Sequence, residues 1–449
     1  CLDFFWLLMV YHVAMIGVSI RLRQKRGEEP VLPALSVHPP VAVLYTTRND
    51  FREEAVHSCL DLDYPEAHVF ILDDSTSANY QKRIDDWAST FSSKITIIRR
   101  PTHEGFKAGN LNNALRQIKD RYPYFVICDA DGILPKKFIT SLLPYFAWDP
   151  QTAFVQALQK ANPAQDGFFG RTMGYMVMSH YRHFVRAKNR FGFVMFYGHG
   201  ALLATKAWEA VGGFPEVVTE DLAFAAKVRE HGFRGYYTER VECLEDFPPT
   251  YGQFRVRTEK WIRGTSQFIK SGYPSFVKSK QVPWYEKFDV LVGALSHYQT
   301  TMMLIFLLVL GTILPAYYDH FRYPGSFFLM PVPEGKSAFE YLVHIRYHIF
   351  WSLDFYIVMA LTLLCHVLPA IMDLFRTPMK MFRYLLVSNF IFLGSLVAET
   401  GALLTFLFTG RAVFRNTHDA VDLSDQKLSF HPNHPVVFML EIVFGAILF

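Results

Sequence analysis

The sequence predicts an α/β domain with a parallel sheet, joined to helices that cross or border a membrane. Hydrophobic residues make up 51% of the 449 residues and charged residues 19%, a balance between that of a soluble enzyme and a pure membrane bundle. Short apolar runs alternate with amphipathic stretches over residues 27–285, and longer apolar segments flank them. Alternation of this kind is typical of βαβ units, and the composition excludes a disordered chain or a simple coiled coil.

Charge and cysteine content narrow the function classes. The formal net charge is +4 without a basic stripe, so the sequence predicts no nucleic-acid partner. The cysteines are Cys1, Cys59, Cys128, Cys243 and Cys365, and no two form a CxxC pair. Their spacing therefore predicts neither a disulfide framework nor a zinc site, and is compatible with a reducing cytosol.

Residues 1–26 are predicted to form a transmembrane helix. Residues 1–20 carry one charge, Asp3, and about 20 apolar residues suffice to cross a bilayer. Four basic residues within 21–26 place the following chain in the cytoplasm by the positive-inside rule and, with no cleavage site, argue against a signal peptide. The segment begins without Met, so we expect it to be truncated upstream.

A cytosolic domain is predicted over residues 27–285, after a Pro-rich linker at 27–38. The expected strands are the apolar runs Val41–Tyr45, Val69–Leu72, Ile95–Ile98 and Phe125–Cys128. Helical patterns such as Asn110–Lys119 separate them, which favours a parallel sheet. A ligand of such a sheet is expected beyond the carboxyl ends of the strands.

Residues 286–449 are predicted to form membrane and interface helices. Val290–Tyr318 carries no formal charge and Tyr347–Met372 carries one, Asp354, so both are long enough to span. Residues 384–410 are apolar but contain Glu399 and have basic residues at both ends. That charge pattern favours a helix at the cytoplasmic interface, and a plain span is the alternative.

Acidic clusters directly follow three predicted strands. They are Thr46–Asp50, Asp73–Ser75 and Asp129–Gly132, and the carboxyl ends of parallel strands converge on one crevice. The Asp129-x-Asp131 pair suits Mg²⁺, which proteins hold with one or two carboxylates plus substrate phosphates. Each cluster alone is more often a turn or a helix cap.

Three further motifs offer cations and carboxylates. Lys107–Asn112 opens a helix and suits an anion, Thr219–Asp221 opens another helix and offers a general base, and Arg257–Gly264 places cations beside an indole. The alternatives are helix capping for the first two motifs and an ordinary amphipathic helix for the third.

Taken in order, these motifs resemble the processive membrane glycosyltransferases of family two, which include synthases of cellulose, other β-glucans, chitin and hyaluronan. The family pattern is Thr-x-Asn-acid, Asp-Asp, Lys-Ala-Gly-Asn, Asp-x-Asp, Thr-Glu-Asp and Gln-x-x-Arg-Trp, and its counterparts occur here in that order. The resemblance implies a GT-A type α/β nucleotide-diphospho-sugar transferase domain joined to an α-helical transmembrane channel. It also implies a UDP-sugar donor, a growing polysaccharide acceptor, Mg²⁺ or Mn²⁺, and a multi-pass protein of the plasma or bacterial inner membrane.

The resemblance also implies residue roles. Asp221 would be the catalytic base with Glu220 beside it, Asp131 and Asp129 would hold the metal, and Trp261 would stack under the acceptor sugar. The donor-binding residues would be Thr47, Arg48, Asp50, Asp73, Asp74, Lys107, Asp129, Arg257, Lys260 and Arg263. A gating loop at 411–433, with Phe414 and Thr417, would close over the nucleotide, with a plain polar connector as an equal alternative.

The sequence departs from the family pattern at several positions. Lys260 stands where the pattern has Arg, and Lys lacks the planar fork that binds phosphate bidentately. Asp419 stands where the gating loop has Lys. His199 lies near the expected acceptor site, where cellulose synthases show Cys-Gly-Ser, and is predicted to bind acceptor or to be a structural histidine.

The expected activity is inverting, processive synthesis of a β-glucan from UDP-glucose, with extrusion through the protein's own helices. Lys107–Asn112 resembles β-glucan synthases more than hyaluronan synthases. The alternatives are a chitin- or hyaluronan-type synthase using UDP-N-acetylglucosamine, a non-processive transferase acting on a lipid, and an inactive scaffold. Accessory export subunits and the lipid bilayer are the other expected partners.

Overall fold

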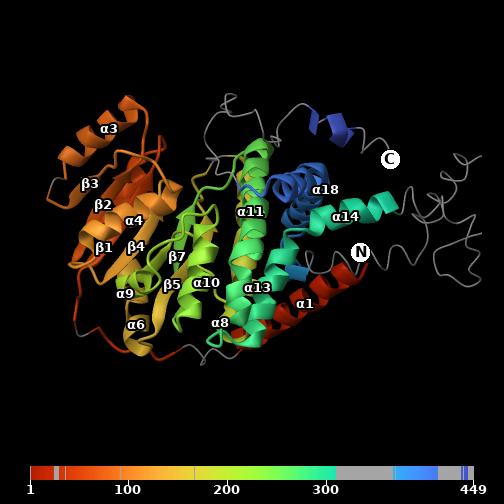
Figure 1. Cartoon of the computed structure of the whole chain (residues 1–449), viewed down its shortest axis with the longest axis horizontal. Helices are drawn as coiled ribbons and strands as arrows, with labels where there is room; N and C mark the ends of the chain where they lie inside the picture. The colour runs from red at the N-terminus through yellow and green to blue at the C-terminus, as the bar shows by residue number, and fades with distance from the viewer. Residues whose placement is uncertain are drawn as a thin grey trace, which may run out of the picture.

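The computed structural model describes residues 2–24, 30–35, 37–91, 93–165, 167–309, 368–369, 371–412, 436–437 and 439–442. Within them, a seven-stranded sheet forms one end of the molecule and a group of helices forms the other (Figure 1). Helix α11 (Tyr251–Ser271) lies between the two parts.

The four predicted strands are confirmed. They are β1 (Val41–Thr47), β2 (Ala67–Asp73), β3 (Ile95–Ile98) and β4 (Tyr124–Asp129). β1 pairs in parallel with β2 and β4, and β2 pairs in parallel with β3. Val41–Tyr45 are all buried, as expected for a continuous apolar run in the centre of a sheet covered on both faces.

The remaining strands make the sheet mixed, so the prediction of a wholly parallel sheet is wrong. They are β5 (Thr152–Ala161), β6 (Ala201–Ala204) and β7 (Arg234–Glu245), and the strand order is β3-β2-β1-β4-β6-β5-β7. β6 runs antiparallel to both β4 and β5. The chain enters it through Gly198 and Gly200, whose positive φ angles of 86° and 60° turn the backbone back toward the sheet.

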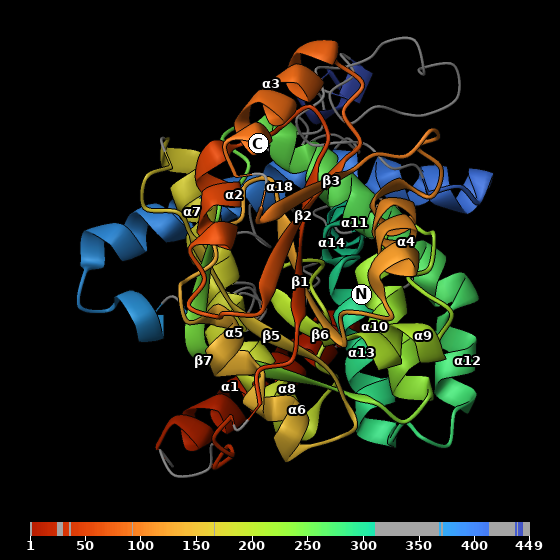
Figure 2. The ribbon, with the colours of Figure 1, turned by 90° about the vertical axis from the view of Figure 1, so that its left-hand side faces the viewer.

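Helices cover both faces of the sheet. Figure 2 shows α2 (Glu53–Leu60) on one side and α4 (Phe106–Ile118), α9 (Thr205–Ala210) and α10 (Glu220–Glu230) on the other. The other short helices of this part are α3 (Ala78–Ser89), α5 (Phe138–Leu142), α6 (Pro144–Trp148), α7 (Phe168–His180), α8 (Arg186–Phe191) and α12 (Tyr273–Lys278). A π-helical turn, η1 (Tyr181–Val185), joins α7 to α8.

Asn112 on α4 ties that helix to the loop that precedes α10. Its Oδ1 accepts hydrogen bonds from Trp208 Nε1 (3.0 Å) and Phe214 N (2.8 Å), and its Nδ2 donates to Phe214 O (2.8 Å). The side chain is buried, so the loss of these bonds would leave buried polar groups without partners.

We therefore expect Asn112→Ala to lower the free energy of unfolding by about 2–3 kcal/mol, because removal of a buried partner exposes the full desolvation penalty. Thermal and denaturant unfolding of the purified chain would measure the loss. Asn113→Ala is the matched control, since Asn113 follows on the same helix and its Nδ2 has no hydrogen-bond partner. Equal stability of the two variants would contradict the prediction.

The second part of the molecule is built from apolar helices. They are α1 (Leu2–Gln24), α13 (Trp284–Ser296), α14 (Gln299–Leu308) and α18 (Pro378–Thr409). Among the described residues, Asp3–Leu22 and Pro378–Thr409 are long and apolar enough to cross a membrane by length and composition. α13 and α14 pass the same test only together, and they are bent by 55° at the break between them.

The bend alters the prediction that Val290–Tyr318 forms one membrane span. The structure describes this segment up to residue 309. The chain does not continue as one straight helix, because α13 ends at Ser296 and α14 begins at Gln299. The Tyr298 hydroxyl lies 3.0 Å from Ser266 Oγ on α11 and fixes the break there. The predicted span Tyr347–Met372 falls almost wholly outside the described residues.

Helix α18 lies across the direction of α14 and α1, as Figures 1 and 2 together show. It packs against α11 and α14. Glu399 accepts a 2.7 Å hydrogen bond from Thr300 of α14, and Ser395 Oγ lies 3.4 Å from the Tyr251 hydroxyl of α11. Ser395 and Glu399 of this apolar helix thus face its neighbours, while Phe390 and Phe408 are exposed.

Candidate active site

The loop after β1 is held in one conformation by its own polar side chains. Asp50 Oδ1 accepts hydrogen bonds from Thr47 Oγ1 (2.9 Å) and from the Arg48 backbone N–H (2.7 Å). Asn49 has a positive φ of 61°, and its Oδ1 accepts from the backbone N–H groups of Thr76 and Ser77. The loops after β1 and β2 are therefore joined at the carboxyl edge of the sheet.

Asp73 and Asp74 are paired with two arginines that follow β3. Arg99 Nε donates to Asp73 Oδ2 (2.7 Å), and Arg100 forms a two-pronged pair with Asp74 at 2.8 and 2.6 Å. The Asp74 side chain is only 8% exposed. Arg99 and Arg100 were not predicted as site residues, although two consecutive arginines directly after the predicted strand Ile95–Ile98 were a usable signal. Both carboxylates are thus already compensated and serve to fix the loop.

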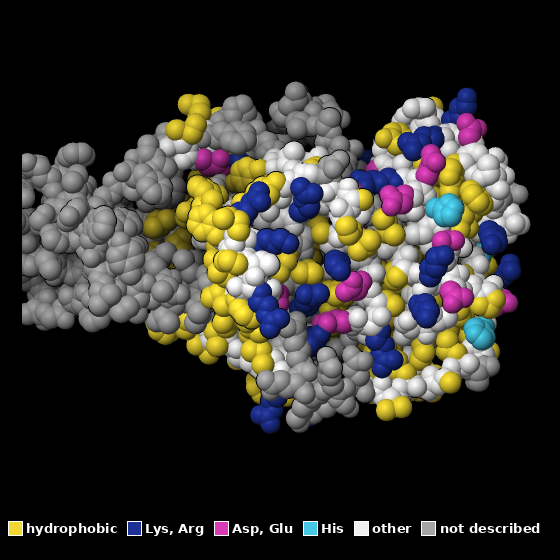
Figure 3. Space-filling model, turned by 180° about the vertical axis from the view of Figure 1, so that it is seen from behind, with side chains coloured by type: hydrophobic (Ala, Val, Ile, Leu, Met, Phe, Trp, Pro, Cys, Tyr) yellow, Lys and Arg dark blue, Asp and Glu magenta, His cyan; other side chains and the backbone are white. Residues whose placement is uncertain are grey.

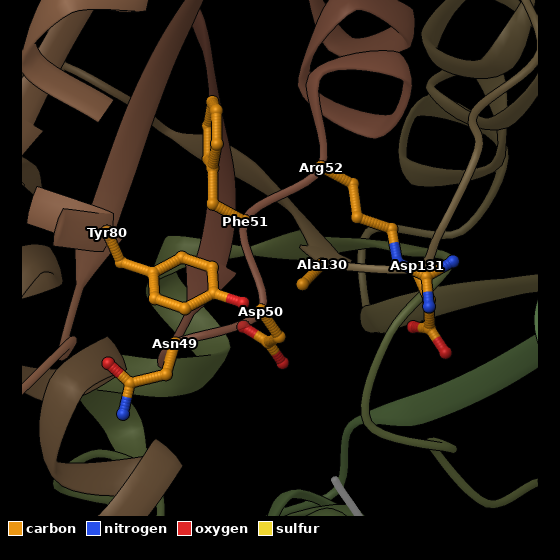
Figure 4. A pocket seen from close by; sticks show the side chains of 7 residues that line it. All are labelled: Asn49, Asp50, Phe51, Arg52, Tyr80, Ala130 and Asp131. Atoms are coloured by element: carbon orange, nitrogen blue, oxygen red, sulfur yellow. The ribbon is translucent and has the colours of Figure 1, made fainter. Parts of the chain in front are cut away.

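A pocket of about 300 Å³ opens between this loop and the Asp-x-Asp turn. Its lining residues are Asn49, Asp50, Phe51, Arg52, Tyr80, Ala130 and Asp131. Figure 4 shows the carboxylates of Asp50 and Asp131 and the Arg52 guanidinium around this space. Arg52 also forms an ion pair with Asp246. Tyr80 and Arg52 were not predicted, because neither belongs to an acidic or glycine-rich motif.

Asp129, at the end of β4, is held by a lysine and a threonine. Thr46 Oγ1 donates to Asp129 Oδ1 (2.9 Å), and Lys107 Nζ donates to the same oxygen and to Gly198 O (3.0 Å). Burial would raise the pKa of Asp129, but the charges of Lys107 and His199 hold that pKa below its usual range. Asp129 is therefore a carboxylate anion, and Lys107 links it to the turn at Gly198.

Asp131 lies in a different electrostatic environment. Burial raises its pKa to about 6, and the charges of Asp129 and Glu245 add to the rise while His199 and Arg52 oppose it. No described residue donates a hydrogen bond to its carboxylate, and water reaches the side chain. A hard cation would stabilise the charged form of such a group.

A fully protein-built metal cage is not present in the described part of the chain. No group of three His, Cys, Asp or Glu side chains there could hold an ion. Asp131, with Asp129 two residues before it, fits the other arrangement, in which one or two carboxylates and the phosphates of a ligand share the metal. The donor set is all oxygen and suits Mg²⁺ or Mn²⁺.

His199 forms an ion pair with Glu245 at the end of β7, with 2.8 Å between Nε2 and Oε2. Burial would lower the pKa of His199, but Glu245 and then Asp129 raise it to about 9. The imidazolium lies close enough to Asp129 and Asp131 to lower both of their pKa values. The structure thus places His199 near the Asp-x-Asp turn. Its predicted contact with the acceptor stays a prediction.

Glu220 and Asp221 open α10 on the other side of Gly198. Burial raises the pKa of Glu220 to about 7, with the charge of Asp221 adding to the rise. Burial also raises the pKa of Asp221. The hydrogen bond from the Leu222 N–H (2.8 Å) and the charges of Lys107 and Lys260 oppose that rise. Burial thus raises the pKa values of both neighbouring carboxyls, which makes each a better proton acceptor than an exposed carboxylate.

Gly198 lies next to side chains of both α4 and α10. A Cβ atom at this position would lie 3.6 Å from Asp221 Oδ2 and 3.8 Å from Lys107 Nζ. Its φ of 86° also belongs to the region that favours glycine. The backbone therefore runs directly past the Lys107 ammonium and the Asp221 carboxylate.

Helix α11 brings part of its motif to the same region. The Arg257 guanidinium lies 4.6 Å from the centre of the Trp261 ring, and both side chains are partly exposed. Burial lowers the pKa of Lys260, and the charges of Glu220 and Asp221 partly offset that decrease. Arg263 does not join Arg257, Lys260 and Trp261 at the surface. Its side chain is only 1% exposed, and its guanidinium lies 2.5 Å from the Glu259 carboxylate. Phe414 and Thr417 lie outside the described residues.

The arrangement combines a base with anion-binding groups. The Glu220 and Asp221 carboxyls, whose pKa values are raised by burial, can take a proton, and Lys107, Lys260 and Arg257 can stabilise a leaving anion. Asp131 lines the pocket beside the loop after β1. Such a site suits the transfer of a group between a hydroxyl and a phosphate-bearing ligand.

Comparisons with known proteins bear on the class of enzyme and on the fold. Residues 124–393 match the model of glycosyl transferase family group 2. Glucans biosynthesis glucosyltransferase H of Xanthomonas campestris pv. campestris strains B100 and 8004 is 24% identical over 346 residues, which cover 70% of this chain and 52% of the relative. The chain thus spans about half the length of these curated relatives.

A solved structure shares the fold. The mannosyltransferase PcManGT from Pyrobaculum calidifontis, in complex with GDP-Man and Mn²⁺, matches with a TM-score of 0.53 and 20% identity. The match covers 90% of this chain and 98% of that one. The mixed α/β sheet is therefore of the type found in such sugar transferases.

Proposed function

The chain belongs to glycosyl transferase family group 2 and is a glycosyltransferase, and on that premise we propose that it is an inverting, processive β-glucan synthase. UDP-glucose is the proposed donor, and the end of a growing β-linked chain is the proposed acceptor. The observation that carries the proposal is the meeting of Lys107, Asp129, Glu220 and Asp221 around Gly198.

The proposed reaction is a single displacement at the anomeric carbon. The acceptor hydroxyl loses its proton to Asp221, its oxygen forms a bond to C1 of the donor sugar, and the C1–O bond to the diphosphate breaks. Lys107, Lys260 and Arg257 stabilise the departing diphosphate. Mg²⁺ or Mn²⁺, held by Asp131 and Asp129 with the donor phosphates, would neutralise charge on that leaving group.

The donor assignment draws on the curated relatives and on the pocket. Those relatives are named for glucan biosynthesis and for glucosyl transfer. The pocket between the β1 loop and the Asp-x-Asp turn offers the Tyr80 ring and the Asp50 carboxylate, which suit a nucleobase and its N–H donor. Thr47 and Arg48 fix Asp50 in place, and Asp73 and Asp74 fix the neighbouring loop.

Membrane association is part of the proposal. We assign residues 27–285 to the cytosolic domain, α1 to a membrane span and 286–449 to a transmembrane and interface region that guides the product outward. Figure 3 shows hydrophobic side chains gathered at the end of the molecule that carries α1, α14 and α18, with Lys and Arg beside them. The crosswise direction of α18, with Arg383 and Arg411 near its ends, supports its placement at the cytoplasmic interface.

Synthesis in inverted membrane vesicles tests the proposal. The vesicles would receive radiolabelled UDP-glucose, UDP-N-acetylglucosamine or GDP-mannose with Mg²⁺ or Mn²⁺, and linkage-specific glycanases would digest the product. A long polymer from UDP-glucose is expected. A short, lipid-extractable product would instead indicate the non-processive transferase, and a polymer from UDP-N-acetylglucosamine a chitin- or hyaluronan-type synthase.

We expect the activity to be lost on acidification at a higher pH than for an enzyme whose base is an ordinary carboxylate. Asp221 must be deprotonated to accept the acceptor proton, and burial raises the pKa values of both Asp221 and its neighbour Glu220. Transfer should therefore fall by about tenfold per unit as the pH drops through the raised pKa of Asp221, at a pH above the usual carboxyl range of about 4. A pH profile of kcat/KM measures this. Activity that stays flat down to about pH 5 would contradict the role of the pair.

A further inference from the structure

Arg52 brings a positive charge to the pocket between the loop after β1 and the Asp-x-Asp turn. Among the described residues that line this pocket, Asp50 and Asp131 carry carboxylates and Arg52 carries the guanidinium. Figure 4 shows the Arg52 side chain extending toward Asp131. The charge of each of these two groups affects the pKa of the other, so they lie close together. The cationic side of the pocket is thus next to the proposed metal-binding carboxylate.

The backbone of Arg52 is fixed to the Asp-x-Asp turn through a buried tyrosine. The Arg52 N–H donates a 3.0 Å hydrogen bond to the hydroxyl of Tyr45, which belongs to β1 and is fully buried. The same hydroxyl lies 3.4 Å from the carbonyl oxygen of Ala130, the middle residue of the turn. The sheet therefore sets the position of Arg52 relative to Asp131, as a site built on rigid elements requires.

Asp246, which follows β7, orients the guanidinium. Arg52 Nη1 donates a hydrogen bond to Asp246 Oδ2, and yet the Arg52 side chain stays 41% exposed. No described residue accepts a hydrogen bond from Arg52 Nε or Nη2. A guanidinium is planar and holds its donors in a fixed fork, so an anchor on one nitrogen leaves the other donors with set directions. Such a fork suits two-pronged contact with a phosphate.

The surrounding charges decide how a phosphate could bind here. Asp246 compensates part of the Arg52 charge, so the guanidinium contributes directed hydrogen bonds as well as attraction. Asp50 Oδ1 already accepts hydrogen bonds from Thr47 and from the Arg48 N–H. The Asp131 carboxylate would repel a phosphate, and Mg²⁺ or Mn²⁺ at that carboxylate would remove the repulsion.

The location of the pocket indicates which phosphate of a donor Arg52 would reach. The Tyr80 ring and the Asp50 carboxylate, which the proposed function assigns to the nucleobase, line the same pocket as Arg52. A phosphate beside a nucleoside in this pocket is the first one, joined to the ribose. Lys107 lies instead with Asp129 and Gly198, where the sugar is transferred in the proposed reaction.

We propose that Arg52, oriented by Asp246, binds the phosphate that is joined to the nucleoside of the donor. The inference rests on the proposed function and adds a phosphate-binding residue to its donor site. Arg52 would share that phosphate with the metal ion proposed at Asp131. The contact is made to phosphate and not to the base, so its loss should leave nucleoside binding unchanged.

Binding of uridine, UMP and UDP to the full chain in lipid nanodiscs tests this role. Ligand-observed NMR titrations would be run with Mg²⁺ and with EDTA. Arg52→Met removes the guanidinium donors and should weaken UMP and UDP binding about tenfold, the scale of losing a charge-assisted hydrogen bond, with uridine affinity unchanged. The loss should appear with and without Mg²⁺, whereas Asp131→Asn should weaken nucleotide binding only when Mg²⁺ is present.

Arg121→Met is the matched control. Arg121 is exposed and precedes β4, so it lies near the opposite end of that strand from the Asp-x-Asp turn. Its replacement should change none of the three affinities. Arg52→Lys keeps the charge but not the fork, and its UMP affinity should lie between those of wild type and Arg52→Met. Should Arg52→Met unfold, Arg52→Gln keeps an amide donor for Asp246 and should show the same selective loss.

The outcomes distinguish this role from the proposed function. Binding needs no turnover, so a wild type that binds UMP but makes no polymer contradicts the proposed function alone. Guanosine, GMP and GDP titrated in parallel would report the same phosphate contact if wild type prefers that base. Equal UMP affinity of wild type and Arg52→Met, an equal loss for nucleoside and nucleotide, or a wild type that binds neither nucleotide series overturns the role of Arg52.

Discussion

Replacement of Asp221 by Asn is expected to lower transfer by about 10³-fold while UDP binding is retained, because a positioned general base contributes on the order of 10²–10⁴ to a rate. The substitution keeps the size of the side chain and its hydrogen bond from the Leu222 N–H. It removes only the capacity to accept a proton. Initial rates of sugar transfer and UDP affinity on the same membrane preparation would measure the two effects separately.

Glu230→Gln is the matched control for Asp221→Asn. Glu230 lies at the opposite end of α10 and accepts a hydrogen bond from Ser275 Oγ at 2.9 Å. This variant should transfer sugar at a rate close to that of wild type. More than a tenth of the wild-type rate in Asp221→Asn would contradict the assignment of the base and direct attention to Glu220, whose pKa is raised to about 7.

The parallel half of the sheet could be predicted because its strands are continuous apolar runs. Each is followed by polar residues, and parallel pairing brings those ends together at one edge. The location of Asp50 and Asp131 at one pocket, with Asp129 at the end of the neighbouring strand, follows from that rule. The sequence could not reveal that β6 enters in the opposite direction, since four buried residues carry no signal of direction.

The partners of the acidic residues depend on contacts between segments far apart in the chain. Arg99 and Arg100 neutralise Asp73 and Asp74 across two strands, and Glu245 from the last strand charges His199. Spacing along a sequence does not encode such pairs. Arg263 illustrates the same limit, because helical periodicity alone does not tell a buried arginine from an exposed one.

The helical part was predicted less completely. Apolar composition gives the length of a helix but not whether the helix crosses a membrane or lies along its surface. Residues 384–410 fall within the single helix α18, and whether that helix spans or lies at the interface depends on its packing. The structure turns Ser395 and Glu399 toward α11 and α14 through hydrogen bonds. A polar residue in an apolar segment is thus explained by its neighbours, which only the fold supplies.

Lys107→Met is expected to reduce transfer by about 100-fold, the scale of losing one preorganised charge contact in an active site. Lys107 donates to Asp129 and to Gly198 O, and its charge lowers the pKa values of Asp129, Glu220 and Asp221. The pKa of the Glu220–Asp221 pair should therefore rise further in the variant. The pH profile should lose activity at a higher pH than that of wild type.

The shift of the acid limb distinguishes a charge that tunes the base from one that only binds donor. Lys107→Arg keeps the charge, so its acid limb should stay close to that of wild type even where its rate falls. Lys119→Met is the matched control, because Lys119 lies on the surface and pairs with Glu209 at 2.7 Å. A weaker donor affinity without any movement of the acid limb would contradict the coupling and leave Lys107 as a phosphate contact alone.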